Sequence, residues 1–145
     1  MIRPATGEDA AAVAALSSQL GYPVSAEAVA ARLERLLRRD DQLVLAAIAD
    51  DGTLAGWIHA ADQDLVESER RCEILGLVVD GRRRRGGVGR RLVTEVERWA
   101  ASRGLRRMSV RSNVTRAESH PFYEAQGYVR LKTQQVYRKV IGGAG

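Results

Sequence analysis

Residues 82–91 read RRRRGGVGRR, and this stretch decides how the chain is organised. It lies between residues 72–79 (CEILGLVV), an apolar run typical of a buried strand, and residues 88–103, whose apolar spacing is typical of an amphipathic helix. Glycines let the backbone approach an anion closely, the first-turn N–H groups of the helix point toward it, and arginines add positive charge. The stretch therefore predicts a binding site for a pyrophosphate group.

Length and composition are those of a folded protein. The chain has 145 residues, 45% hydrophobic and 28% charged, which predicts one domain over residues 1–145 with a flexible tail at 140–145. No apolar run is long enough to cross a bilayer, and the first residues lack the layout of a signal peptide. The single cysteine, Cys72, lies in an apolar run. We interpret it as a reduced core thiol, which favours a cytoplasmic protein.

Charge is divided unevenly along the chain. Residues 1–72 hold seven arginines and twelve acidic residues, whereas residues 73–145 hold sixteen basic and six acidic residues. The basic half suits a polyanion and the acidic half suits a cation. Four acidic residues lie close together in the first half: Asp62, Asp64, Glu67 and Glu69. They form either a surface for a cationic ligand or a solvated hairpin loop, and the sequence leaves both interpretations open.

The hydrophobic periodicity predicts a mixed α/β fold with the element order β-α-α-β-β-β-α-β-α-β-β. Thr6 with Asp9 predicts a capping box at the first helix, and Ser25 predicts the cap of the second. Gly76 inside a strand suggests a bulge or a close backbone approach. The predicted strands are residues 1–4, 42–49, 54–61, 71–79, 106–112, 128–131 and 135–140, and the predicted helices are residues 8–20, a segment after 25, 88–103 and a segment from about 115 to 127.

Residues 84–89 (RRGGVG) match the pattern Arg/Gln-x-x-Gly-x-Gly/Ala, directly after an apolar strand and at the start of a helix. Downstream, residues 122–128 (FYEAQGY) are similar to a second family segment, FYE-x-x-GF/Y. On these residues the chain resembles the GNAT superfamily of acyl-CoA-dependent N-acetyltransferases over nearly its whole length. The resemblance implies a GNAT-type fold with a central splayed strand pair. It also implies acetyl-CoA as co-substrate and no metal, and it suggests a homodimer.

The resemblance assigns cofactor-binding roles to individual residues. Backbone groups of Leu77, Val78 and Val79 would hold the pantetheine arm of acetyl-CoA, and an amide near Leu77 or Val78 would polarise the thioester carbonyl. Asn113 matches a side-chain contact to pantetheine, and it is nearly as consistent with an ordinary turn residue. The pyrophosphate would be held by the loop residues Arg84, Arg85, Gly86, Gly87, Val88, Gly89 and Arg90.

The resemblance also assigns the catalytic residues. Tyr123 matches the tyrosine that protonates the departing thiolate, and a phenol is protonated at neutral pH. Glu73 matches a position where some members place the base, although it could instead pair with Arg70 or Arg71. The two-residue period of a strand predicts that Glu73 and Leu77 point to the same face.

Two neighbours of Tyr123, a histidine and a proline, leave the catalytic assignment open. His120 is an alternative base, or it packs in a turn. Pro121 is compatible with a helix only if that helix begins near Ser119, because proline is tolerated in the first turn.

The predicted function is transfer of an acetyl group from acetyl-CoA to a primary amine of a small cationic acceptor, by direct attack in a ternary complex. The alternatives are a protein lysine or N-terminal acetyltransferase and a non-catalytic CoA-binding or nucleic-acid-binding module. Aromatic residues make up only 5% of the chain, which argues against nucleic-acid binding.

Overall fold

The computed structural model describes residues 1–111 and 119–142, with the backbone alone at Arg84, Arg85 and Ser119. The chain divides into two compact units, Met1–Arg111 and Ser112–Gly145. The predicted flexibility of residues 143–145 concerns positions outside the described residues.

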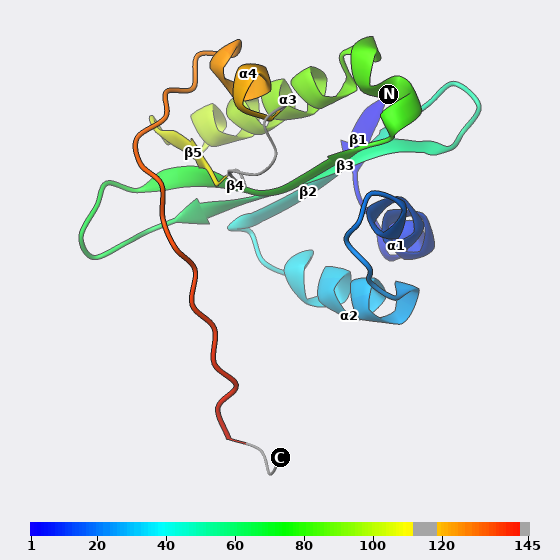
Figure 1. Cartoon of the computed structure of the whole chain (residues 1–145), viewed down its shortest axis with the longest axis horizontal. Coiled ribbons are helices and arrows are strands. Elements are labelled where there is room, and N and C mark those ends of the chain that lie inside the picture. The colour runs from blue at the N-terminus through cyan, green and yellow to red at the C-terminus, as the bar shows by residue number, and fades with distance from the viewer. Residues whose placement is uncertain (112–118, 143–145) are drawn as a thin grey trace. The chain divides into compact units, whose positions relative to one another are not determined.

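The first unit is built on a five-stranded sheet with the strand order β1-β2-β3-β4-β5 (Figure 1). The first four strands pair antiparallel with their neighbours, and β5 pairs parallel with β4 after the crossover through α3. The sequence prediction of a mixed α/β fold is therefore confirmed. The strands are β1 (Ile2–Pro4), β2 (Gln42–Ile48), β3 (Leu54–Gln63), β4 (Arg71–Val79) and β5 (Met108–Val110).

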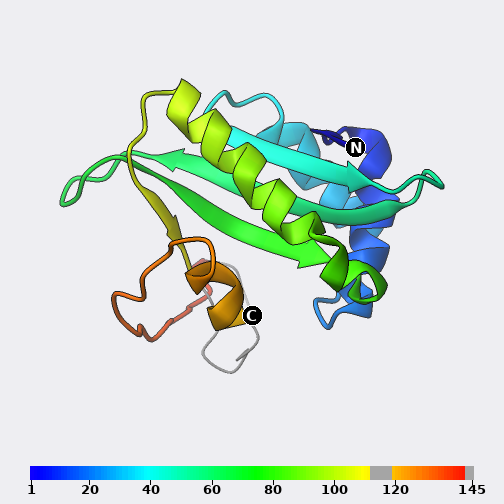
Figure 2. The ribbon, with the colours of Figure 1, turned by 90° about the horizontal axis from the view of Figure 1, so that it is seen from above.

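Helices cover both faces of the sheet (Figures 1 and 2). On one face lie α1 (Ala10–Gln19) and α2 (Ala26–Leu36), whose buried residues pack against Val44 and Ala46 of β2. On the other face lies α3 (Val88–Ser102), which runs diagonally across the strands in Figure 2. Its first turns come so close to β3 that a Cβ on Gly56 would lie 3.3 Å from Val88 Cγ1. Burial on both faces supplies the main stabilisation of this unit.

Local sequence signals place the helix ends where they were predicted. Thr6 and Asp9 form the capping box, which opens a short 3₁₀ turn, η1 (Gly7–Asp9), directly before α1. The Ser25 side chain accepts a hydrogen bond from the Ala28 amide at 3.1 Å and caps α2. Side-chain oxygens at these positions satisfy amides that lack a helical partner.

The pairing of β3 with β4 contains a bulge at Leu75. His59 lies opposite Gly76 and Ala60 lies opposite Ile74, so Leu75 is an extra residue on β4. Gly76 also permits a close approach, because a Cβ there would lie only 2.9 Å from the Trp57 ring. The predicted bulge is confirmed next to Gly76, and the close approach at this glycine is made by a side-chain ring and not by a backbone.

The prediction that Glu73 and Leu77 share a face is wrong, and the bulge is the reason. Glu73 lies opposite Ala61 and Leu77 lies opposite Ile58, and these two partners point to opposite faces of β3. Ala61 shares its face with Trp57, whose indole donates to α1. Glu73 therefore belongs to the face covered by α1 and α2, and Leu77 to the face covered by α3.

β4 and β5 pair over a short distance only. The parallel ladder joins Cys72 to Met108, Glu73 to Ser109 and Ile74 to Val110. β4 continues to Val79, and no strand pairs with this side of it beyond Ile74 among the described residues. The residues that follow β5, 112–118, lie outside the described chain, so the splayed strand pair stays a prediction.

The second unit contains α4 (Ser119–Glu124) followed by a segment without helix or strand. Pro121 lies in the first turn of α4, where proline is tolerated. The predicted capping box at Thr115 lies outside the described residues. The two final strands, predicted at residues 128–131 and 135–140, are not observed, since the structure describes this segment without strand structure and a strand requires a paired neighbour.

The single cysteine is buried in β4, where it is fully inaccessible to solvent. Burial raises the pKa of the Cys72 thiol to about 12, so the group stays protonated at neutral pH. This environment fits the interpretation of Cys72 as an unreactive core thiol. Within residues 1–111 and 119–142, no helix combines the length and apolar character needed to cross a membrane.

Candidate functional site

The loop between β4 and α3 is built around Asp80, which is 3% exposed. The loop is a 3₁₀ turn, η2 (Gly81–Gly86), and the Asp80 carboxylate caps it by accepting a hydrogen bond from the Arg82 amide at 3.1 Å. The Asp80 amide donates to the Ala55 carbonyl at 2.8 Å, which fixes the loop to β3. A fixed loop of this kind holds backbone amides in place without a ligand.

Gly87 joins η2 to α3 in a conformation that suits glycine. Its φ is +77°, in the left-handed region, and it occupies the N-cap position of α3. The Arg91 amide donates to the Gly87 carbonyl, so the amides of Val88, Gly89 and Arg90 in the first turn have no acceptor within the helix. Amides at a helix N-terminus favour an anion, as the sequence predicted for this loop.

Two arginines of the loop and one from the first turn of α3 contact the protein itself. Arg82 pairs with Asp80 at 3.0 Å, and Arg83 lies 3.6 Å from Asp51. Arg91 donates to the Gly86 carbonyl at 3.1 Å. These side chains stabilise the loop in addition to any charge they offer to a ligand.

Replacing Asp80 should loosen the loop. We expect Asp80→Ala to cost about 1 kcal/mol in the free energy of unfolding, since it removes the cap of η2. Denaturant unfolding measures this, with the exposed Asp40→Asn as control. The hydrogen bond from Arg82 lowers the pKa of Asp80, so its stabilising effect should be present above about pH 4 and disappear as the pH falls through the folded-state value. Equal loss of stability in both variants would contradict the capping role.

A hollow of about 350 Å³ lies beside the loop, on the side of β1 and β2. Its lining includes Ile2, Ala47, Arg83, Gly86 and Arg91. The pantetheine arm is predicted to bind along the edge of β4 that faces β5. In the strand order β1-β2-β3-β4-β5 this edge lies away from β1 and β2, so the hollow is not the predicted pantetheine site.

The strand edge predicted to bind pantetheine is open toward β5. Leu77, Val78 and Val79 pair with β3 on one side, opposite Ile58, Trp57 and Gly56. On the other side no strand pairs with them among the described residues. Within residues 1–111 and 119–142, no strand takes the backbone N–H and C=O groups on this side, which are the groups that a ligand along the strand would use.

Glu73 is buried among polar groups on the face covered by α1 and α2. Its carboxylate Oε1 accepts a hydrogen bond from the Ser109 hydroxyl at 3.0 Å. Arg71 lies 3.7 Å and Arg111 3.9 Å from the same oxygen. Of the two arginines that the sequence offered as partners, Arg71 is the one that contacts Glu73, while Arg70 contacts Asp62.

Two residues that the sequence analysis did not select share this face. His59 lies opposite Gly76 on β4, and its Nε2 lies 2.7 Å from Gln42 Oε1. Burial lowers the pKa of His59, so the imidazole is neutral at pH 7. The Trp57 ring crosses over Gly76 and its indole donates to the Ser17 hydroxyl at 3.1 Å. The two-residue alternation of Trp57, His59 and Ala61 in β3 was the signal that could have placed the three on one face of the sheet.

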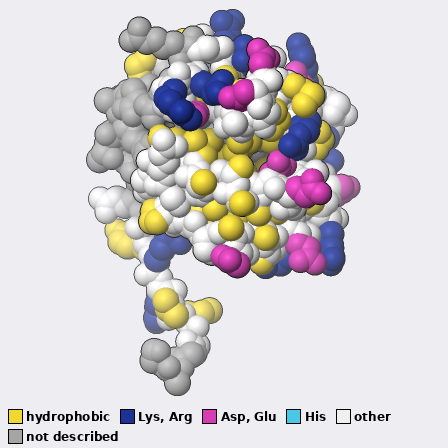
Figure 3. Space-filling model, turned by 90° about the vertical axis from the view of Figure 1, so that its right-hand side faces the viewer, with side chains coloured by type: hydrophobic (Ala, Val, Ile, Leu, Met, Phe, Trp, Pro, Cys, Tyr) yellow, Lys and Arg dark blue, Asp and Glu magenta, His cyan; other side chains and the backbone are white. Residues whose placement is uncertain are grey.

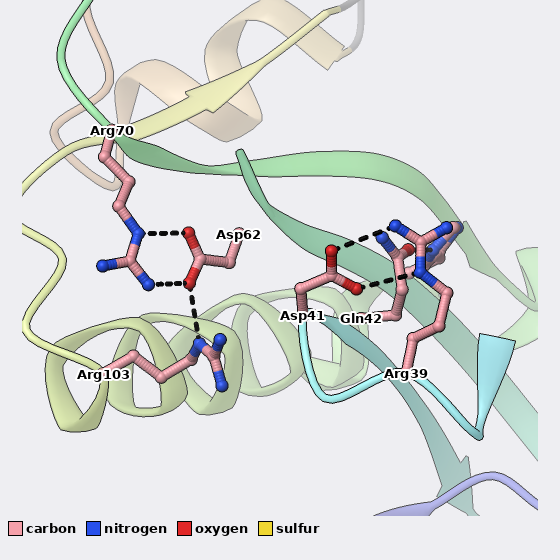
Figure 4. Close-up of polar contacts among 7 residues, drawn as sticks. Arg39, Asp41, Gln42, Asp62, Arg70 and Arg103 are labelled. Atoms are coloured by element: carbon pink, nitrogen blue, oxygen red, sulfur yellow. Dashed lines mark hydrogen bonds and ion pairs between the residues drawn. The ribbon is translucent and has the colours of Figure 1, made fainter. Parts of the chain in front are cut away.

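The acidic loop is only partly available to a cation. Asp62 lies between Arg70 and Arg103, at 2.5 and 2.9 Å, and its side chain is 3% exposed (Figure 4). The hydrogen bond from Arg70 is the main cause that lowers its pKa. Glu69 lies 3.4 Å from Arg107. Asp64 and Glu67 are exposed, and they are the two acids of this group that remain candidates for a cationic ligand.

Tyr123 lies in α4 of the second unit. Its ring makes edge contacts with Phe122 and Tyr128, at 5.0 and 5.8 Å between centroids. Burial raises the pKa of Tyr123 to about 12, so its hydroxyl is protonated over the physiological range. His120 is half-buried in the same helix, and Asn113 lies outside the described residues. Among the described residues, no cluster of His, Cys, Asp or Glu is arranged to hold a metal ion.

Comparison with known proteins agrees with this geometry. The model of the acetyltransferase (GNAT) family matches residues 10–128. The chain therefore belongs to the GNAT family and is an acyl-CoA-dependent N-acetyltransferase, the class for which acetyl-CoA is the co-substrate. None of the curated proteins matches the chain.

Solved structures share the fold over nearly the whole chain. Aminoglycoside 6'-N-acetyltransferase AAC(6')-Ih from Acinetobacter baumannii is 21% identical with a TM-score of 0.84, covering 98% of this chain and 99% of its own. AAC(6')-Iy, in complex with the bisubstrate analogue CoA-S-monomethyl-acetylneamine, is 26% identical with a TM-score of 0.84, covering 97% and 98%. A GNAT family acetyltransferase from Staphylococcus aureus is 20% identical with a TM-score of 0.78, covering 96% and 98%.

Proposed function

We propose that this protein transfers the acetyl group of acetyl-CoA to a primary amine of a small cationic acceptor. The observation that carries the proposal is the loop at Gly87, which presents first-turn amides of α3 directly after the open edge of β4. The amides suit the pyrophosphate, and the strand edge suits the amide groups of pantetheine. The site residues assigned from the sequence, including Arg84, Arg85 and Asn113, remain part of this proposal.

The proposed reaction is a direct attack in a ternary complex. The neutral amine nitrogen attacks the thioester carbon, and a backbone amide of Leu77 or Val78 stabilises the oxygen that becomes negative. The C–S bond then breaks, and the CoA thiolate takes the proton of the Tyr123 hydroxyl. The amine loses its extra proton to a base, which leaves an N-acetylated product and free CoA.

Glu73 is our candidate for that base, directly or through water. All of its described contacts involve Oε1, so we assign Oε2 as the atom that receives the proton. A water molecule between the amine and Glu73 would relay the proton where the two groups do not touch. His59 is a second candidate, because its imidazole is neutral and lies on the same face of the sheet. His120 remains the alternative taken from the sequence.

Two observations support a cationic acceptor: the acidic residues of this chain and its similarity to solved acetyltransferases. The first half of the chain is acidic, and Asp64 and Glu67 are exposed beside β3 and β4. Similar structures are described as aminoglycoside acetyltransferases, and aminoglycosides are polycationic amines. A polyamine or a lysine side chain has the same chemistry, so a protein acetyltransferase is the alternative.

Acetylation of an amine panel tests the proposal. We expect CoA release with an aminoglycoside or a polyamine, and a rise of about tenfold in the KM for the acceptor in Asp64→Asn/Glu67→Gln, since two attracting charges are lost. Asp40→Asn/Glu27→Gln makes the same charge change at other exposed positions and should leave this KM unchanged. Because Cys72 is buried, a thiol reagent should detect the released CoA and not the protein.

Other outcomes would contradict the acidic-loop assignment or favour one of the alternative functions. An unchanged acceptor KM in Asp64→Asn/Glu67→Gln would remove the acidic loop from the proposal. Tight binding of acetyl-CoA without transfer to any amine would favour a non-catalytic CoA-binding module. Affinity for nucleic acid that falls steeply with salt would favour the remaining alternative.

We also propose a cellular location, a domain organisation and an oligomeric state for the protein. We infer a cytoplasmic location from the single, buried thiol. We infer one domain over residues 1–145, and two copies that associate as a homodimer.

A further inference from the structure

The hollow beside the loop that joins β4 to α3 is a second candidate binding site. It lies on the face of the sheet that α3 covers, because Ile2 pairs with Ala47, and Ala47 lies opposite Gly56 under the first turn of α3. Its volume of about 350 Å³ falls within the range of small-molecule pockets. Figure 3 views the first unit from the end where α3 begins in Figure 1, and it shows hydrophobic side chains bordered by basic and acidic ones.

Apolar side chains from three strands and one helix form one part of the lining. Ile2 comes from β1, Ala47 from β2, Ala55 from β3 and Val88 from the first turn of α3. Two of these residues are alanines, whose small side chains leave room between the sheet and the helix. A surface of this kind suits the hydrocarbon part of a ligand.

Arg83, in the same lining, holds a hydrogen-bond donor that the protein leaves unused. Its Nε is buried and has no hydrogen-bond partner among the described residues. Another nitrogen of the guanidinium, Nη2, lies 3.5 Å from the Thr53 hydroxyl and 3.6 Å from the Asp51 carboxylate. Buried N–H groups are nearly always paired, so we expect an acceptor at Nε that the described chain does not supply.

A second guanidinium of the lining has no carboxylate as partner. Arg91 donates to the Gly86 carbonyl at 3.1 Å, and none of the described carboxylates forms an ion pair with it. Arg82, by contrast, already pairs with Asp80 at 3.0 Å. Arg83 and Arg91 are therefore the two arginines of the lining that can still bind an anionic group.

The lining also limits the charge that a ligand can carry. It contains one described carboxylate, Asp50, which is exposed. Asp50 would repel a second negative charge, whereas a single carboxylate would meet the two arginines. The hollow therefore favours a ligand with one negative charge over inorganic phosphate or the phosphate groups of CoA.

We propose that the hollow binds a small monocarboxylate with an apolar body. The carboxylate accepts hydrogen bonds from Arg83 Nε and from Arg91, and the hydrocarbon part lies against the apolar lining. Gly86 lines the hollow directly before Gly87, so the ligand lies next to the loop proposed for the pyrophosphate and occupies a separate site. The proposal concerns binding alone and does not depend on acetyl transfer.

Calorimetric titration of the full-length protein with hexanoate and with benzoate tests the site. We expect saturable binding, with a loss of at least about tenfold in affinity in Arg83→Met and in Arg91→Met, since each change removes a charged hydrogen bond. Arg106→Met removes the same charge at an exposed position outside the lining and should leave the affinity unchanged. Hexanamide, which lacks the charge, and inorganic phosphate should each bind at least about tenfold more weakly than hexanoate.

Amide chemical shifts locate the ligand and separate it from the CoA site. Hexanoate should shift the amides of Ala47, Ala55 and Gly86, and it should still bind when the protein is saturated with CoA. Competition with CoA would place the carboxylate in the CoA site and overturn the proposal. Equal affinity in Arg83→Met, or no saturable binding of either carboxylate, would also overturn it and would leave water as the partner of Arg83 Nε. Hexanamide or phosphate that binds as tightly as hexanoate would overturn the ligand class.

Discussion

Acetyl-CoA should lose at least about 100-fold in affinity for a Gly87→Glu variant, because a carboxylate would stand beside the first-turn amides that are proposed to bind the pyrophosphate. Space is not the constraint at Gly87, since a Cβ there would lie 3.6 Å from the nearest described atom, in Arg91. The constraint is the φ of +77°, which a side chain adopts at a cost of about 1 kcal/mol, together with the new negative charge.

Gly104 provides a matched control for this experiment. It follows α3, its φ is +79°, and a Cβ there would meet no described atom within 4 Å. Gly104→Glu therefore introduces the same charge and a similar backbone strain at the far end of the same helix. Calorimetric titration with acetyl-CoA and with CoA should show normal affinity for Gly104→Glu. Near-normal affinity in Gly87→Glu would reject the loop as the pyrophosphate site.

Tyr123→Phe should reduce kcat by about 100-fold while both KM values stay near those of the wild type, as expected when a general acid is removed. Phenylalanine keeps the ring that packs edge-on against Phe122 and Tyr128, so the variant should fold normally. Tyr137→Phe removes a hydroxyl at an exposed position and is the matched control.

The pKa of Tyr123 adds a pH criterion. A phenol with a pKa of about 12 remains protonated up to about pH 11, so loss of this acid should not reduce kcat in the range from pH 6 to 10. Steady-state kinetics over this range measures it. Undiminished turnover in Tyr123→Phe would remove the acid assignment, although membership of the GNAT family would stand.

Much of the fold was predictable because its signals are local. The capping box at Thr6 and the cap at Ser25 each depend on residues within one helical turn. The parallel crossover followed from a strand, a glycine-containing loop and a helix in sequence. The predicted class of enzyme also depended on contiguous residues, chiefly the loop from Arg84 to Gly89.

The candidate site was less predictable because it depends on register. No periodicity indicates that Ser109 hydrogen-bonds Glu73, since the contact joins two strands 36 residues apart. Asp62 was expected in a solvated or ligand-binding loop, yet Arg70 and Arg103 already neutralise it. The strand patterns at residues 128–131 and 135–140 are local signals too, but strand formation also requires pairing with another strand, and the structure describes no strand over these residues.

Leu75, the bulge residue, shifts the alternation of side chains between the two faces of β4 by one residue. Before it, Glu73 belongs to the side of α1 and α2. After it, Val78 belongs to that side although it is five residues away. Deleting this one residue would leave Glu73 opposite Ala61 and Leu77 opposite Ile58, so both residues would keep their faces and only the local bulge would be lost. A codon deletion at Leu75 should therefore be tolerated better than a codon deletion at a paired position of β4, which would move the residues beyond it to the opposite face of the sheet.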